Sequence, residues 1–543
     1  MLQHSVQTLT AEDTCDVLVL GAGIAGISAA IAAGEQGASV ILACKGPLFS
    51  GSSFYPGTWG LGLIGPEDPE DEDDLVDSIL LVGCGMADET MVRAFVHGIP
   101  PAIAYVEQLG VKLKKAQTGA SQKEYIPCFD HKHRAWNGLE AESCREVFSR
   151  KLQQLGVKVL PGWEALELVK TDGRVCGAVF SNGQSLQYVG SKAVVLASGG
   201  YGSLFRHHLC TGDVEGLGQS LALDAGASLI NMEFMQIMPG YLAPAYGTIY
   251  NEKVFRFSHL EKDGRSILEG MPEEDLLAQR SGHGPFTSRL GDRAVDLAIH
   301  QAKTGVIIRY SGALRENMPE FVKTYFDWLQ ESKAVTLETP ITVDLFAHAA
   351  NGGIRIDPQA FTGVPGLFAA GEVTGGMHGA DRIGGLSTAN GLVFGGKAGR
   401  SAASHAMETN CPPETIQLSM EGTSGAREVL ERLQGLMTAN AMVNRCEEGL
   451  QESLAQVRTL RRKLELHGTE NVREIADAKR ILGQLQTAEA ILLADLLRKE
   501  SRGSHHRKDY PREDPALLNG VLIRKEGDGP RAELAPIPFP AGI

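Results

Sequence analysis

The sequence has no closely spaced cysteine pairs. Its nine cysteines are scattered over 543 residues, and no two of them form a C-x-x-C pair. Such pairs supply ligands to most structural zinc sites and iron–sulfur clusters, so we expect no metal site within the chain. An odd number of dispersed cysteines is typical of reduced thiols, and we expect a cytoplasmic protein.

The sequence also lacks long hydrophobic runs and an excess of positive charge. No apolar run approaches the roughly 18–20 residues of a membrane span, and residues 1–15 have neither the basic start nor the apolar core of a secretory signal. The 51 Lys and Arg residues against 66 Asp and Glu residues give a net charge of −15. Because nucleic acid requires a basic surface, we predict neither a membrane span nor a nucleic-acid partner.

Glycine, in contrast, is abundant, and its most informative cluster lies in DVLVLGAGIAGISAA (16–30). An apolar strand runs into a G-x-G-x-x-G turn, a small-residue helix follows, and ASVILA (38–43) is predicted to be the second strand. This order seats a dinucleotide pyrophosphate on the helix N-terminus. Five residues are expected to face the cofactor: Gly21, Gly23, Ile24, Ala25 and Gly26.

The acidic residue that usually ends the second strand and binds a ribose is missing. Cys44 or Lys45 takes its place, which weakens the case for NAD and leaves the ribose contact unassigned.

The pattern along the rest of the chain predicts an α/β protein of three parts. Strand–glycine elements recur at 193–205 and 363–376, and helices are expected at 140–155, 216–226, 291–303 and 389–406. The acidic run 66–77 is predicted to be a solvated loop that caps the first of two amphipathic helices within 74–110. No structure of its own is expected for the tail, 534–543. We predict a Rossmann-like dinucleotide-binding domain (1–235 and 341–423), interrupted by an α+β capping domain (236–340) and followed by a helical C-terminal domain (424–543).

Several motifs together resemble one family. They are CKGPLFSGSSFY near the front, ASGGYG in the middle, then HAANGGI, LFAAGEV and HGADRIGG, and finally LRKESRGSHHRKDYPRED (497–514). In this combination the chain resembles the fumarate reductase and succinate dehydrogenase flavoprotein family, which includes L-aspartate oxidase.

The resemblance implies FAD rather than NAD as the cofactor. It places Lys45, Ser50, Ser52 and Ser53 along the ribityl and phosphate path, Glu372 on a ribityl or ribose hydroxyl, and Ser387 near the isoalloxazine, with Gly199 and Gly200 in the second glycine motif. Some members bond flavin covalently through a histidine. The serines around Gly51 have no histidine beside them, so non-covalent FAD is expected.

The resemblance also implies a set of catalytic residues. His348 and Arg382 match the carboxylate-binding pair, and arginine suits that role because its planar fork grips a carboxylate through two hydrogen bonds. Arg289, in TSRLGDRAVD (287–296), matches the proton donor, with Leu290 where an aspartate is usual. Glu252 matches the relay glutamate. The relay arginine falls on Phe255, with Arg256 one residue late.

The chain departs from the family where a second carboxylate would bind. The family's E-F-x-Q-F-H-P-T becomes EFMQIMPG (233–240), so Met238 and Gly240 replace the histidine and threonine. The loop that usually has Q-G-G beside the flavin has GTW, which ends at Trp59. Apolar groups would leave a second carboxylate desolvated and unpaired. We therefore expect a substrate with one carboxylate and an apolar or aromatic remainder.

The predicted function is an FAD-dependent oxidoreductase acting on a carbon–carbon bond next to a carboxylate, most simply a reductase of an unsaturated acid other than fumarate. Two alternatives stay open: an L-aspartate oxidase-like amine oxidation, and a flavoprotein electron-transfer subunit of a larger complex. Electrons would come from a partner protein, from free reduced flavin or from a nicotinamide donor.

Overall fold

The core of the molecule is an eight-stranded sheet, seen here in a computed structural model that describes residues 6–58, 61–115, 126–316 and 318–537. Its strands run in the order β6-β2-β1-β9-β8-β7, with β17 paired to β9 and β19 paired to β1. The strands are β1 (Val6–Leu20), β2 (Val40–Cys44), β6 (Lys158–Pro161), β7 (Glu164–Thr171), β8 (Arg174–Ser181), β9 (Leu186–Leu196), β17 (Leu367–Ala369) and β19 (Thr415–Ser419).

The three strand–glycine elements of the sequence lie side by side, and their strands end at the same level of this sheet, at their carboxyl ends. β1 and β17 both lie parallel to β9, and Leu20 and Ala369 are each in register with Leu196. The loops after these three residues therefore leave the sheet side by side. Open parallel sheets bind ligands at the carboxyl ends of their strands.

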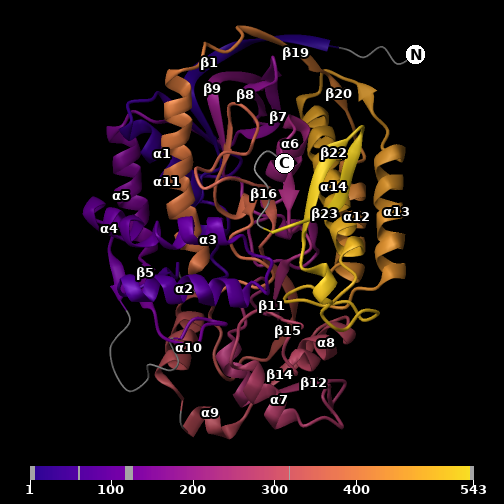
Figure 1. Cartoon of the computed structure of the whole chain (residues 1–543). Helices are drawn as coiled ribbons and strands as arrows, with labels where there is room; N and C mark the ends of the chain where they lie inside the picture. Colours follow the sequence, from indigo (N-terminus) through magenta and orange to yellow (C-terminus); the bar gives the residue numbers. More distant parts are fainter. Residues whose placement is uncertain (1–5, 59–60, 116–125, 317, 538–543) are drawn as a thin grey trace.

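Two long helices cover one face of the sheet in direct backbone contact. α1 (Ile24–Glu35) lies along α11 (Leu386–Met407), as Figure 1 shows. Glycines at every fourth position of α11 make this approach possible. A Cβ atom at Gly395 would lie 2.5 Å from the carbonyl oxygen of Ala25, and one at Gly399 would lie 2.2 Å from that of Ala29.

The acidic run does not form the predicted loop, because it is itself helical. α2 (Pro69–Val82) begins directly after Asp68, whose carboxylate accepts a hydrogen bond from Asp71 N at 2.9 Å. Proline suits the first helical position, and the acidic side chains of the first turn favour the positive end of the helix dipole. The prediction of two helices up to Gly110 was also wrong. Three helices fill this stretch, since α3 (Glu89–Val96) and α4 (Ile99–Leu109) follow.

Shorter elements connect the sheet to the rest of the chain. They are β3 (Ile64–Gly65), β4 (Leu113–Lys115), β5 (Ala135–Leu139), α5 (Ala141–Gln154) and α6 (Leu217–Ala225). The helix predicted to close at Gly226 does so: this glycine is left-handed, with φ of 104°.

A second, five-stranded sheet belongs to the inserted segment and lies at the lower end of Figure 1. Its strand order is β11-β15-β14-β12-β13. The elements are β11 (Met235–Ala243), β12 (Ser258–Lys262), β13 (Arg265–Ser266), α7 (Glu273–Arg280), α8 (Arg293–Gln301), β14 (Val306–Tyr310), α9 (Gly312–Glu316), α10 (Glu320–Lys333) and β15 (Ile341–Ala350). β15 lies inside this sheet, so residues 341–350 pack with the inserted segment although the sequence pattern grouped them with the first domain.

The C-terminal part supplies three helices and a hairpin. α12 (Ala426–Asn440), α13 (Glu447–Lys463) and the long α14 (Val472–Leu497) pack on the side of the molecule away from α1 (Figure 1). β22 (Gly520–Glu526) and β23 (Gly529–Ala535) extend a sheet begun by β10 (Leu229–Ile230), β16 (Gly353–Arg355) and β18 (Thr374–Gly375). Leu534 and Ala535 thus belong to a strand, whereas no structure had been expected from 534 onward; residues 538–543 lie outside the described chain.

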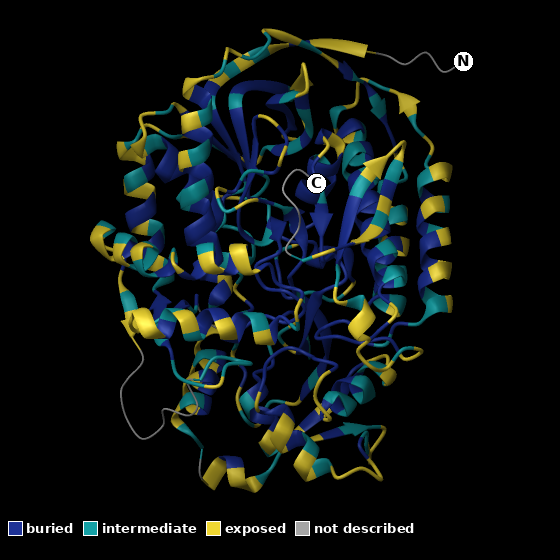
Figure 2. Ribbon diagram, in the orientation of Figure 1, coloured by how far each residue is buried: buried dark blue, intermediate teal, exposed yellow. Residues whose placement is uncertain are grey.

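Burial follows these layers. In the central sheet β2, β8, β9 and β17 are buried along almost their whole length, and exposed residues collect on the outer faces of helices such as α2 and α13 (Figure 2). No helix within the described ranges is long and apolar enough to cross a membrane.

Candidate active site

A cavity of about 1430 Å³ lies where the three glycine loops leave the central sheet. The inserted segment closes its other side, through residues of β11, α10 and the end of β15. A pocket for one small ligand is typically about 300–1,000 Å³. The cavity is therefore large enough to hold a cofactor and a substrate together.

The first glycine turn forms one wall, and two of its three glycines have no space for a side chain. Gly21 is left-handed, with φ of 114°, and a Cβ atom there would lie 2.2 Å from the carbonyl oxygen of Ala197. A Cβ atom at Gly26 would lie 1.8 Å from the carbonyl oxygen of Gly21. At Gly23, which opens to the cavity, the nearest atom would be Ser53 Oγ, at an ordinary contact distance of 3.5 Å. Gly21, Gly23, Ile24 and Ala25 line the cavity, whereas Gly26 lies behind this wall and supports it.

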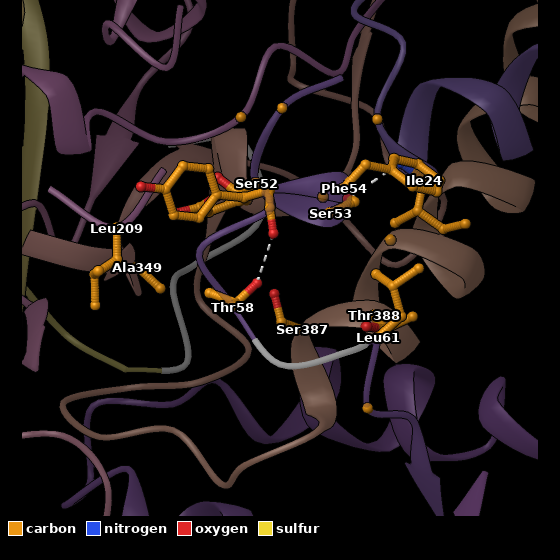
Figure 3. A pocket seen from close by; sticks show the side chains of 18 of the residues that line it. Ile24, Ser52, Ser53, Phe54, Thr58, Leu61, Leu209, Ala349, Ser387 and Thr388 are labelled. Carbon is orange, nitrogen blue, oxygen red and sulfur yellow. Dashed lines mark hydrogen bonds between the residues drawn. The ribbon is translucent and has the colours of Figure 1, made fainter. Parts of the chain in front are cut away.

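The predicted serines lie opposite this turn. Ser50, Ser52 and Ser53 line the cavity, and Ser53 Oγ accepts a hydrogen bond from Ile24 N at 3.3 Å (Figure 3). Between them Gly51 has φ of 74° and no neighbour within 4 Å of a built Cβ atom. Ser387, at the start of α11, lies on the same cavity (Figure 3).

Glu372 is held at the cavity by backbone groups. Its Oε1 atom accepts a hydrogen bond from Ala350 N at 3.0 Å, and burial raises the pKa of this carboxyl. Gly199 lines the cavity, while Gly200 packs behind Glu372, so that a Cβ atom there would lie 2.5 Å from Glu372 Oε1.

Acidic groups that the sequence did not single out surround Lys45. The Lys45 ammonium lies 2.7 Å from Glu215 and 3.0 Å from Glu164, and all three residues line the cavity. Asp213 lies beside them, with a buried Oδ1 atom that has no hydrogen-bond partner in the described structure. None of these groups stands at the end of the second strand, because β7 and the loop before α6 supply them.

Taken together, this wall fits a dinucleotide. Backbone N–H groups at the start of α1 face the cavity, the glycines leave room for phosphates, and serine hydroxyls and carboxylates line the path beyond. Such groups recognise a pyrophosphate and hydroxylated chains.

Arg382 and His348 lie together on the opposite part of the cavity wall. The buried Arg382 guanidinium donates two hydrogen bonds to Gln236 Oε1, at 3.0 and 2.7 Å. Burial, with the neighbouring Arg382 charge, lowers the pKa of His348 to about 3, so this imidazole is neutral. Its Nδ1 atom has no partner among the described groups. A neutral histidine can donate a hydrogen bond to a carboxylate, while Arg382 supplies the charge.

The wall next to this pair is apolar. Met238, Tyr55, Leu209 and Ile249 line it, with Phe346 packed behind Met238 and Leu209. The loss of the threonine at Gly240 has a packing reason, because a Cβ atom there would lie 2.8 Å from Phe346 Cδ2. Trp59, the other residue expected on this wall, lies outside the described residues.

Arg289 is not among the cavity-lining residues. Its Nε atom donates a hydrogen bond to Asp381 at 3.1 Å, and its guanidinium lies 5.5 Å from the centre of the Phe129 ring. Thr287 donates to the same Asp381 oxygen at 2.8 Å. Arg289 is thus paired with the residue that directly precedes Arg382.

Glu252 does line the cavity, and its partner is a cysteine. The Glu252 Oε1 atom accepts a hydrogen bond from Cys128 Sγ at 3.4 Å. Phe255 is buried and Arg256 is exposed, so the two positions considered for a relay arginine lie away from this pair. No sequence motif had pointed to Cys128.

Comparison with known proteins agrees with these features. The family described as FAD binding domain matches residues 16–388, and the family described as fumarate reductase flavoprotein C-term matches residues 430–540. The fumarate reductase flavoprotein subunit of Mycobacterium tuberculosis is 27% identical, over 95% of this chain and 95% of its own length. L-aspartate oxidase of Mycobacterium bovis is 26% identical, over 95% of this chain and 96% of its own.

A solved structure has the same fold. Mycobacterium smegmatis Sdh1 in complex with UQ1 has a TM-score of 0.80 at 24% identity, covering 96% of this chain and 94% of that chain. The matches confirm the resemblance, the fold class and FAD as the cofactor. The chain therefore belongs to the FAD-dependent oxidoreductases of the fumarate reductase and succinate dehydrogenase flavoprotein family, which has L-aspartate oxidase among its relatives.

Proposed function

We propose that this enzyme reduces the double bond of an unsaturated monocarboxylic acid that carries an apolar or aromatic substituent. The observation that carries the proposal is the contrast within one cavity wall. One buried arginine, Arg382, lies next to an apolar surface formed around Met238. Such a wall accepts one carboxylate and an apolar group, and it leaves a second carboxylate unpaired.

In this reaction the residues of the cavity would have separate roles. The glycine turn and the serines would hold FAD non-covalently, and in its reduced form the cofactor would provide the hydride for one carbon of the double bond. Arg382 binds the substrate carboxylate and draws electron density toward it. Neutral His348 donates a hydrogen bond to the same group. The apolar wall excludes water and so strengthens both interactions.

The test is anaerobic reoxidation of the reduced flavin. We expect cinnamate, an aryl acrylate, to reoxidise the reduced holoenzyme at least about tenfold faster than fumarate at equal low concentration. Crotonate, a short monocarboxylate, separates the effect of charge from that of the apolar substituent. Reoxidation by fumarate at a rate equal to or greater than that by cinnamate would contradict the proposal.

L-aspartate oxidation is the second candidate, because an L-aspartate oxidase is among the relatives. Aspartate carries two carboxylates, and Met238 disfavours the second one just as it does for fumarate. The formation of hydrogen peroxide and oxaloacetate from aspartate by the holoenzyme would favour this candidate. We also propose that electrons reach the flavin from a donor outside this chain, which a screen of nicotinamides, free reduced flavins and partner proteins would identify.

A further inference from the structure

We propose that Asp381 positions the guanidinium of Arg289, the residue that matches the family's proton donor, so that its two terminal nitrogens stay free for the substrate. The inference rests on the proposed function, because it concerns the proton that the reduction requires at the carbon that does not receive the hydride. Asp381 directly precedes Arg382 in the chain, yet its carboxylate binds the other arginine.

The hydrogen bond to Asp381 holds Arg289 through its Nε atom. This atom donates to Asp381 Oδ2 at 3.1 Å, and Thr287 Oγ1 donates to the same oxygen at 2.8 Å. Neither Nη atom of Arg289 has a hydrogen-bond partner among the residues that the structure describes. Because the guanidinium is planar and rigid, a fixed Nε atom also fixes the directions of the two Nη atoms.

The neighbours of Arg289 belong to the two segments that form the substrate end of the cavity. The guanidinium lies 5.5 Å from the centre of the Phe129 ring and is bound by Asp381. Phe129 directly follows Cys128, and Asp381 directly precedes Arg382. Cys128 and Arg382 both line the cavity. Arg289 therefore lies directly behind the wall that surrounds the substrate.

A third segment, the C-terminal motif at 497–514, binds the backbone beside both partners. Ser288 N donates a hydrogen bond to Gly503 O at 2.7 Å, and Ser504 Oγ donates one to Ala380 O at 2.9 Å. A Cβ atom at Gly503 would lie 2.6 Å from Ala380 Cβ, so the two loops are in direct contact. The motif thus fixes the positions from which the donor and its carboxylate partner extend.

The two arginines of the site differ in the charge of their partners. Asp381 is completely buried, and burial raises the pKa of its carboxyl to about 6, although Arg289 opposes the shift. The carboxyl is therefore ionised at neutral pH and balances the charge of Arg289. Arg382 donates instead to the neutral amide of Gln236, and it forms no ion pair with any described residue. Its charge thus stays available to the substrate carboxylate.

This arrangement fits a balanced proton transfer. When hydride adds to one carbon, the electron pair of the double bond moves to the carbon next to the carboxylate. An N–H bond of Arg289 breaks, a C–H bond forms at that carbon, and a neutral guanidine remains until it takes a proton from solvent. Although burial lowers the pKa of Arg289, the charge of Asp381 raises it above its ordinary value, which favours this return.

The experiment follows the anaerobic reoxidation of reduced holoenzyme by the acid that reacts fastest with the wild type. Asp381→Ala should slow this step by about 100-fold, since a misplacement of about 1 Å can cost that much. Asp381→Asn keeps an oxygen acceptor for the Nε atom and should be intermediate. The substrate Kd, read from the oxidised flavin spectrum, should stay at the wild-type value, because Arg382 keeps its partner. A wild-type rate in Asp381→Ala would overturn the proposal.

Asp344→Ala is the matched control. Asp344, in β15, is another buried aspartate, and burial likewise raises its pKa to about 6. Its Oδ1 atom accepts a hydrogen bond from Leu345 N at 2.7 Å. We expect reoxidation at the wild-type rate, because this variant loses a buried carboxylate without affecting Arg289.

A double variant distinguishes positioning from a general structural role. If Asp381 acts through Arg289, Asp381→Ala should cause no further slowing in an enzyme that already carries Arg289→Gln. A further loss of about 100-fold in that background would contradict the proposal, because Asp381 would then act through other residues.

The pairing can also be measured in the apoprotein, without turnover. Removal of one member of a buried ion pair leaves the other unpaired, whereas removal of both leaves no unpaired charge. The decrease in Tm for the double variant Asp381→Ala/Arg289→Gln should therefore be smaller than the sum of the decreases for the single variants. Additive decreases would refute the pairing.

The outcomes separate the positioning role from the proposed function. If the wild type reduces an unsaturated acid and Asp381→Ala does so at the same rate, only the positioning role fails. If no unsaturated acid reoxidises the reduced wild-type flavin, the proposed function itself fails, and the role of Asp381 falls with it.

Discussion

The two ends of the cavity are built on different principles. At the cofactor end, glycines and backbone groups form the wall, and a Cβ atom at Gly21 or Gly26 would overlap a carbonyl oxygen. At the substrate end, side chains such as Arg382, Met238 and His348 form it. A wall made of backbone tolerates almost no substitution, whereas a wall made of side chains can change its chemistry while the fold stays the same.

This difference explains why the cofactor is shared across the family and the substrate is open to change. Fold and cofactor follow from geometry that relatives must keep. At the substrate end, a few side chains decide which ligand can bind. Substitutions at four positions test this contrast.

Gly26→Ala should have the largest effect. Its methyl group would lie 1.8 Å from the carbonyl oxygen of Gly21, so α1 must move away from the sheet. We expect a loss of more than about 2 kcal/mol in the free energy of unfolding and protein that purifies without FAD. Flavin absorbance and thermal unfolding measure both.

Gly23→Ala is the matched control for this prediction. The nearest atom to its methyl group would be Ser53 Oγ, at 3.5 Å. This variant should unfold like the wild-type apoprotein yet bind FAD weakly, because the methyl group occupies the approach of the phosphates. Normal FAD content in Gly26→Ala would contradict the idea of a backbone-built wall.

Arg382→Gln tests the charged part of the substrate end. Loss of a hydrogen-bonded charge pair removes about 3 kcal/mol, so kcat/KM should fall by about 100-fold. FAD content should be unchanged, in contrast to Gly26→Ala. Steady-state kinetics with the preferred acid measures the effect, and Arg427→Gln, at a residue 93% exposed, is the control. A parallel loss of FAD would mean that the two ends are not independent.

Met238→His should change specificity more than rate. A hydrogen-bonding side chain would give a second carboxylate a partner. The ratio of kcat/KM for fumarate to that for the apolar acid should then rise by about tenfold. Met238→Leu keeps the apolar surface and should keep the wild-type preference. An unchanged ratio in the histidine variant would show that Met238 does not face the substrate.

His348 should have the smallest effect, visible as a pH dependence of stability. Its pKa is about 3 in the folded protein and 6.5 ordinarily, so the unfolded state binds more protons between these values. Stability is therefore full above 6.5 and is lost as the pH falls toward 3. One pH unit below 6.5, His348→Asn should relieve at most about 1.4 kcal/mol of this loss. Tm against pH for the ligand-free protein measures it, and equal slopes would contradict a neutral buried imidazole.

Much of the cofactor end could be predicted from sequence because its signal is local. A strand, the spacing of three glycines and a helix lie within fifteen residues, and each constrains the backbone directly. The acidic run before and in α2 was wrongly predicted to be a solvated loop, because its composition is a local signal that does not show its packing. Charge runs are usual on exposed surface, and only the packing of Arg134 against Asp71 shows that this one also has a buried partner.

The substrate end could be predicted only in part. Local motifs selected Arg382, His348, Glu252 and Met238, and the structure places all four on one cavity. Cys128 was missed because it belongs to no recognised motif. Gln236 was overlooked although it occupies the glutamine of E-F-x-Q in EFMQIMPG. Arg289 carried a plausible motif, yet its side chain points to Asp381.

The sequence by itself determined a dinucleotide turn and the type of fold, because glycines and hydrophobic strands impose their geometry within a few residues. The family and FAD followed from the resemblance that several motifs carry together. Only the tertiary structure decided which side chains meet at the substrate end. Cys128 and Glu252 are 124 positions apart, as the contact between them records. Such a contact depends on how the inserted segment packs against the loop before β5, which no short stretch of sequence specifies.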